Sequence, residues 1–193
     1  MDASLTGVLL AGGRSARMGV DKAAMAFDGE PLAVRVARRL GECCDRVLVA
    51  SGDGRRLAWL GLEQVADPIP DAGPLAGIVA GLEHAPGPAA AVAAVDMPFA
   101  SPGVLRLLAS LRGDADAVVP VTDDGLEPLH AVYATSAAAA LRSELESGVR
   151  AVREAIEGLR VRLVERLEWS PADPSGAFAR NLNRPADLPR GSG

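Results

Sequence analysis

Short apolar runs alternate with stretches of helical periodicity along this chain of 193 residues. The first run, Gly7 to Leu10, contains no polar residue and ends in glycine-rich sequence, as expected for a strand that is buried on both faces. A later stretch opens with Pro74 and repeats apolar residues at helical spacing through Leu75, Ile78, Val79 and Leu82. This alternation limits the chain to folds in which helices cover a sheet.

The same two signals continue to the end of the chain. We expect further strands at 47–50, 62–66, 90–95, 117–121 and 161–164, and further helices from Pro31 onward and at 104–111, 136–145 and 149–156. This order predicts a three-layer α/β/α, Rossmann-like fold with a mainly parallel sheet and right-handed crossovers. We expect a single domain over residues 1–188 and a disordered tail at residues 189–193.

Composition excludes several classes of protein. Hydrophobic residues make up 49% of the chain, which is enough for one full core, and the net charge is −5, which argues against a protein that coats nucleic acid. We find no apolar segment that could span a membrane and no basic region at the N-terminus typical of a signal peptide, so we expect a cytoplasmic protein. Cys43 and Cys44 are adjacent, which fits a reducing compartment better than a disulfide framework.

The segment from Leu10 to Lys22 is rich in glycine and directly follows the first predicted strand. Glycines allow backbone N–H groups to turn toward a phosphate, and Arg14, Arg17 and Lys22 supply positive charge. The spacing matches neither a Walker A loop nor a dinucleotide fingerprint. Glycine-rich surface loops with solvated arginines are common, but the position after the first strand favours phosphate binding, because ligands of such sheets lie at the carboxyl ends of the strands.

Rare residue types mark two further positions. Lys22 is the only lysine in the chain; this is either a coincidence or a sign of function, since a compact, mobile ammonium group suits contact with a phosphoryl group. Asn181 and Asn183 are the only asparagines, and on an extended segment they would point to the same side. They could fix a polar ligand or shape a turn before Pro185, and the sequence leaves both readings open.

Asp96 is the candidate metal ligand. It directly follows the apolar run at 90–95, so its carboxylate is expected at the carboxyl edge of the sheet, where the glycine-rich segment begins. Mg²⁺ is usually held by one or two carboxylates together with phosphate oxygens and water. The alternative is a structural Asp that shapes the turn before a helix.

Five segments resemble the molybdenum cofactor guanylyltransferase family. They are LLAGGRSARMGVDKA at 9–23, which contains the glycine-rich segment, the GPLAG segment at 73–77, the VDMP turn at 95–98, PLHAVY at 128–133 and NLNRPADL at 181–188. The segments keep the order of the family, and the resemblance spans residues 7–188. The resemblance implies the nucleotidyltransferase form of the fold described above.

The resemblance implies a role for each matching residue. Leu10, Ala11 and Gly12 would line the guanine pocket, Gly13 would continue the loop, Lys22 would contact the triphosphate, and Asp96 would bind Mg²⁺. Asn181 and Asn183 would lie on the pterin side of the site.

The match leaves some positions open. The family places an acidic nucleotide-binding residue shortly before GPLAG; we favour Asp67 because it follows a predicted strand, while Asp71 stays possible. Where family members can carry a nucleotide-binding Asn, this chain has Ala50-Ser51-Gly52, so that contact is lost, moved to Ser51 or made by the backbone. His130 fits the family pattern, but we assign it no role.

The implied reaction is Mg²⁺-dependent transfer of GMP from GTP to the molybdenum–pterin cofactor, with release of pyrophosphate. Lys22, Arg17, the loop N–H groups and Mg²⁺ on Asp96 would share the charge that develops on the phosphates. Partners would include GTP, the pterin cofactor and molybdoenzyme maturation proteins. We expect no binding to nucleic acid or to a membrane. The alternatives are a cytidylyltransferase acting on the same cofactor and a nucleotide-binding protein without turnover.

Overall fold

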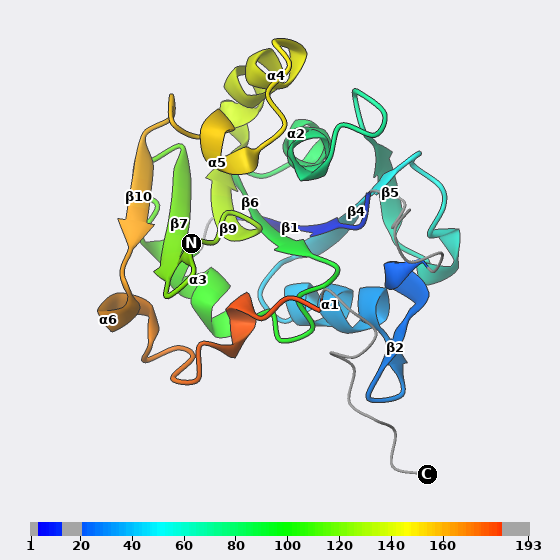
Figure 1. Ribbon diagram of the computed structural model, residues 1–193, viewed down its shortest axis with the longest axis horizontal. Helices are drawn as coiled ribbons and strands as arrows, with labels where there is room; N and C mark the ends of the chain where they lie inside the picture. Colours follow the sequence, from blue (N-terminus) through cyan, green and yellow to red (C-terminus); the bar gives the residue numbers. More distant parts are fainter. Residues whose placement is uncertain (1–3, 13–20, 183–193) are drawn as a thin grey trace.

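The computed structural model describes residues 4–12 and 21–182 of the chain. Gly13, Arg17 and Asn183 lie outside these residues, as does the predicted tail at 189–193. Within them, helices cover both faces of a central sheet (Figure 1). No helix in the described part of the chain is long and apolar enough to cross a membrane.

The central sheet has the strand order β10-β7-β9-β6-β1-β4-β5, and a short strand β8 pairs with β7. Its strands are β1 (Leu5–Leu10), β4 (Arg46–Gly52), β5 (Glu63–Ala66), β6 (Ala89–Ala94), β7 (Ala117–Thr122), β8 (Gly125–Leu126), β9 (His130–Ala134) and β10 (Val161–Val164). β1 runs parallel to both neighbours, with Leu10 opposite Ala50 of β4 and Ala94 of β6. The carboxyl ends of these three strands therefore meet at one edge of the sheet.

Helices form two layers. α2 (Pro74–His84), α4 (Ala138–Glu146) and α5 (Val152–Ala155) cover one face, and α1 (Leu32–Gly41), α3 (Pro102–Ser110) and α6 (Arg166–Trp169) cover the other (Figure 1). The strands in the middle are apolar throughout because both of their faces are buried; all six residues of β1 and of β6 are buried. The predicted three-layer fold with a mainly parallel sheet is confirmed.

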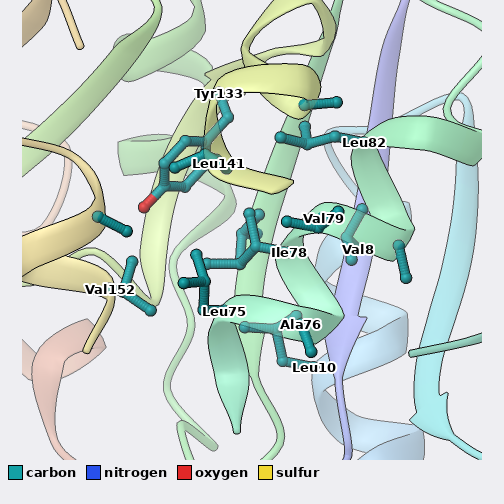
Figure 2. Close-up of a cluster of buried hydrophobic side chains, with 14 of the residues drawn as sticks. Val8, Leu10, Leu75, Ala76, Ile78, Val79, Leu82, Tyr133, Leu141 and Val152 are labelled. Carbon is teal, nitrogen blue, oxygen red and sulfur yellow. The ribbon is translucent and has the colours of Figure 1, made fainter. Parts of the chain in front are cut away.

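α2 is the helix that lies deepest in the core. Its Leu75, Ile78 and Val79 are fully buried between β1 and a group of side chains from β9, α4 and α5 (Figure 2). Pro74 stands at its first position and has no N–H that needs a partner there. Packing of this helix directs its N-terminus toward the carboxyl ends of β1 and β4.

Several elements differ from the expectation. β9 is antiparallel to β6 and β7 and was not expected from its short run of mixed residues. β2 (Ala26–Phe27) and β3 (Glu30–Pro31) form a hairpin whose turn residues, Asp28 and Gly29, both have positive φ. The helix expected at 149–156 shrinks to the four residues of α5, because Ala151 is extended.

Candidate active site

A cavity of about 270 Å³ lies where the parallel strands end. The ends of β1 and β6, the start of α2 and the short 3₁₀ helix η1 (Lys22–Ala24) enclose it. It is lined by Leu10, Ala11, Gly12, Asp21, Lys22, Ala23, Asp67, Gly73, Pro74, Gly77, Ala94, Val95, Asp96 and Leu129. The structure thus brings together most of the site residues that the sequence predicts.

Lys22 and Asp96 meet in this cavity although 74 positions separate them. Lys22 Nζ donates a hydrogen bond to Asp96 Oδ2 at 3.1 Å, and the two side chains are 20% and 24% exposed. The turn after β6 is closed by the backbone bond from Met97 N–H to the Ala94 carbonyl, so the Asp96 carboxylate is paired with a cation rather than with its own turn. An ammonium group and a carboxylate therefore face the same space beside the glycine-rich segment.

Lys22 is held in place by its own helical turn. Asp21 stands at the N-cap of η1, and its Oδ1 accepts a hydrogen bond from Ala23 N–H at 3.0 Å. Side chains of this kind satisfy the free N–H groups at the start of a helix. This hydrogen bond therefore fixes the start of the helical turn that carries Lys22.

Asp67 lies at the end of β5 against three glycines. A Cβ at Gly12 would lie 3.2 Å from Asp67 Oδ2, and Cβ atoms at Gly52 and Gly77 would lie 4.0 and 3.8 Å from its two oxygens. Burial, and to a smaller extent the charge of Asp71, raises the pKa of Asp67 to about 6. Its Oδ1 is buried without a hydrogen-bond partner among the described residues, so a donor from a ligand would satisfy it.

A second hollow of about 350 Å³ lies on the other side of Asp67, toward β4. Ser51 is 2% exposed there, and its Oγ also lacks a partner in the described part of the chain. Asp71 lines this hollow but not the cavity that holds Lys22, whereas Asp67 lines both spaces. Asp67 is therefore the acidic residue that is better placed to meet a ligand in the main cavity.

Comparison with known proteins places these features in a family. The sequence model of the MobA-like NTP transferase domain matches residues 7–185. The chain belongs to the MobA-like NTP transferase family. The match covers every element of the site, from the glycine-rich segment to the asparagines.

Relatives within the family carry related names. The chain is 36% identical over 190 residues to a probable molybdenum cofactor guanylyltransferase of Chloroflexus aggregans, a match that covers 95% of this chain and 91% of the relative. It is 42% identical over 164 residues to a molybdenum cofactor guanylyltransferase of Burkholderia ambifaria, which covers 78% and 80% of the two chains.

Solved structures show the same fold. Molybdopterin-guanine dinucleotide biosynthesis protein A of Archaeoglobus fulgidus superposes with a TM-score of 0.83 at 30% identity, over 95% of this chain and 94% of that one. The 2-C-methyl-D-erythritol 4-phosphate cytidylyltransferase of Thermus thermophilus superposes with a TM-score of 0.68 at 21% identity, over 94% of each chain, and shares the fold.

In this MobA-like chain, Asn181 does not line the cavity of Lys22 and Asp96, although its neighbour Leu182 contacts the Asp96 backbone. Leu182 N–H donates to the Asp96 carbonyl at 2.8 Å, and Asn181 lines a separate, larger cavity of about 870 Å³. Phe27, Trp169 and Arg180 line this larger cavity as well. The backbone of Asp96 is therefore bonded to the segment that lines the larger cavity.

His130 has a structural place in the MobA-like fold. It is fully buried, its Nε2 accepts a hydrogen bond from Ser101 N–H at 2.9 Å, and its ring packs 4.7 Å from that of Phe178. Burial lowers the pKa of His130 to about 4, so the ring is neutral near pH 7. His130 thus contacts both the segment after Asp96, through Ser101, and the segment before Asn181, through Phe178.

One contact of the family site was not predicted. Arg56, from the loop after β4, donates to the Asp21 carboxylate and to the Ala11 carbonyl. No signal in the sequence marks it, because Arg55-Arg56 reads as a solvated pair in a loop. Only the fold brings this loop beside the glycine-rich segment.

Proposed function

We propose that this chain transfers the GMP part of GTP to the molybdenum–pterin cofactor and releases pyrophosphate. The observation that carries the proposal is the contact of Lys22 with Asp96 in a cavity walled by the glycine-rich segment. The names of its relatives support the substrate class, since they are guanylyltransferases of this cofactor.

The nucleotide would enter the smaller cavity, the one of about 270 Å³ that holds Lys22 and Asp96. Lys22 would leave Asp96 for the triphosphate, and the loop N–H groups would donate to phosphate oxygens. Asp67 would accept hydrogen bonds from N1–H and the 2-amino group of guanine, and Leu10, Ala11 and Gly12 would pack against the base. Gly13 and the charge of Arg17 stay predictions of the family resemblance.

The donor set fits a metal that arrives with the nucleotide. The described residues hold no group of three or more Asp, Glu, His or Cys side chains that could bind a metal by themselves. Asp96 offers one carboxylate, which suits Mg²⁺ because this ion is usually completed by phosphate oxygens and water. When bound, Mg²⁺ supplies Lewis acidity at the phosphate oxygens.

The chemical step would be an in-line attack by the terminal phosphate of the cofactor on the α-phosphorus of GTP. A new P–O bond forms while the bond to pyrophosphate breaks, and the nucleophile is already ionised near neutral pH. The larger cavity, with Asn181 on its wall, would hold the pterin. The protein contributes position and charge rather than a base, and delivery of the product to molybdoenzyme maturation proteins stays an expectation.

A binding screen tests the proposal. Binding of ATP, GTP, CTP and UTP to the full chain is measured by calorimetry, with and without Mg²⁺. We expect GTP to bind most tightly and to bind better with the metal present. A chain that binds none of the triphosphates would contradict any transferase of this kind.

A further inference from the structure

Arg56 stands on a loop that the end of the sheet holds rigid. Asp53 Oδ1 accepts hydrogen bonds from the N–H groups of both Arg55 and Arg56, at 3.0 and 2.8 Å. Gly54 has a φ of +74° and is pressed against β5, so that a Cβ there would lie 3.2 Å from Ala66. The backbone of Arg56 is therefore fixed before its side chain reaches the site.

The Arg56 guanidinium joins the two sides of the glycine-rich segment. One of its nitrogens donates to the Ala11 carbonyl, near the start of the segment, and the other donates to the Asp21 carboxylate, near its end. A planar guanidinium can hold two acceptors in a fixed geometry, which an ammonium group cannot do. The side chain is 24% exposed, so water competes only in part for these bonds.

Asp21 links this contact to the lysine. One carboxylate oxygen receives Arg56, while the other caps η1, which begins with Lys22. The chain of contacts thus runs from the loop after β4, through Asp21, to the turn that aims Lys22 at Asp96.

We infer that Arg56 is a positioning residue that holds Ala11 and Asp21 at a fixed separation and so fixes the direction of Lys22 for the triphosphate. The inference rests on the proposed function for its ligand, GTP. Arg56 does not line the smaller cavity with Lys22 and Asp96, so it acts through Asp21 and Ala11 rather than on the phosphates.

The test compares Arg56→Ala with Arg55→Ala in the full chain. Arg55 has the same charge, belongs to the same turn, and has no side-chain partner among the described residues, so it is a matched control. We expect Arg56→Ala to raise the Kd and the KM for GTP about tenfold while the KM for the pterin cofactor stays unchanged. Arg56→Lys keeps the charge without the planar fork, and we expect it to recover only part of the loss.

Hydrogen exchange supplies a readout without ligand. In free Arg56→Ala, the Ala23 amide should exchange faster than in the wild type, because its acceptor, Asp21, is no longer held. Unchanged exchange at Ala23 or unchanged GTP affinity in Arg56→Ala would overturn the inference, as would equal losses in Arg55→Ala. A wild-type chain that binds no GTP would instead overturn the proposed function. The exchange at Ala23 would still report whether Arg56 holds Asp21 in place.

Discussion

Lys22 and Asp96 carry opposite charges and neutralise each other across the smaller cavity. Both side chains keep partial access to solvent, so their ion pair should contribute only about 0–1 kcal/mol to stability. The pair is therefore better explained by a role in binding a triphosphate and a metal than by a contribution to the stability of the fold.

Removing either partner of this pair should impair turnover in a different way. We expect Lys22→Ala to fold normally and to lose about 10²–10³ in rate, as typically follows the loss of a well-placed charge. Asp96→Asn should weaken Mg²⁺-dependent turnover much more than metal-free GTP binding. Pyrophosphate release across a Mg²⁺ titration measures turnover in both variants, and calorimetry without Mg²⁺ measures GTP binding. Near-normal rates in a folded Lys22→Ala chain would contradict the role of the lysine. Wild-type metal dependence in Asp96→Asn would mean that Asp96 only shapes the turn.

Asp67 should lower the stability of the folded chain and contribute to its affinity for GTP. Burial raises its pKa to about 6, from an ordinary value of 3.8, so the folded chain holds this proton more tightly than the unfolded chain does. This group's contribution to the free energy of unfolding therefore falls as pH rises from about 4 to about 6. We expect Asp67→Asn to raise the melting temperature near pH 7.5, to leave it almost unchanged near pH 4, and to weaken GTP binding about tenfold.

The matching wild-type experiment follows GTP affinity with pH. Because the ionised carboxylate accepts the guanine donors, the affinity should drop as pH falls through about 6. Asp67→Asn should lose this dependence. A wild-type affinity that stays flat from about pH 7.5 to about pH 5 would show that Asp67 does not read the base.

At the scale of elements, the contact of α2 with β1 sets where the site forms. Gly81 lies so close to β1 that an added Cβ would be 2.5 Å from Val8 Cγ1, a distance that side chains cannot accept without a shift. Val8 is fully buried and lies in the core cluster that surrounds α2 (Figure 2). The close approach of this helix holds Gly77 and the start of α2 against Leu10 and Asp67.

Gly81→Ala should therefore destabilise the fold. Overpacking of a dense core costs about 1–3 kcal/mol, while alanine regains at most about 1 kcal/mol of helix propensity, so we expect a net loss. Gly41→Ala is the control, because Gly41 ends α1 with nothing within 4 Å of an added Cβ. Chemical denaturation of the two variants decides; a Gly81→Ala chain as stable as the control would mean that α2 moves away from β1 at little cost.

At the scale of the whole molecule, periodicity predicted the parallel strands and their helices because both faces of the sheet are buried. β9 was not predicted as a strand because its run of apolar residues is short, and its antiparallel direction follows from its pairing with β6 and β7. Within the candidate site, the proximity of Lys22 and Asp96 could be predicted because each follows a strand whose carboxyl end lies at the same edge. The contact of Arg56 with Asp21 could not be predicted, because Arg56 follows no strand end at this edge and reads as a solvated residue of a loop.

The central claim is tested most directly by supplying GTP and CTP in competition to the full chain, with Mg²⁺ and the molybdenum–pterin cofactor, and by measuring the nucleotide joined to the pterin. We predict the guanine product, with GTP preferred over CTP on the order of 10²-fold, because cytosine leaves the acceptors of the base pocket unpaired. Equal or better incorporation of CMP would contradict the account and assign the chain to cytidylyl transfer.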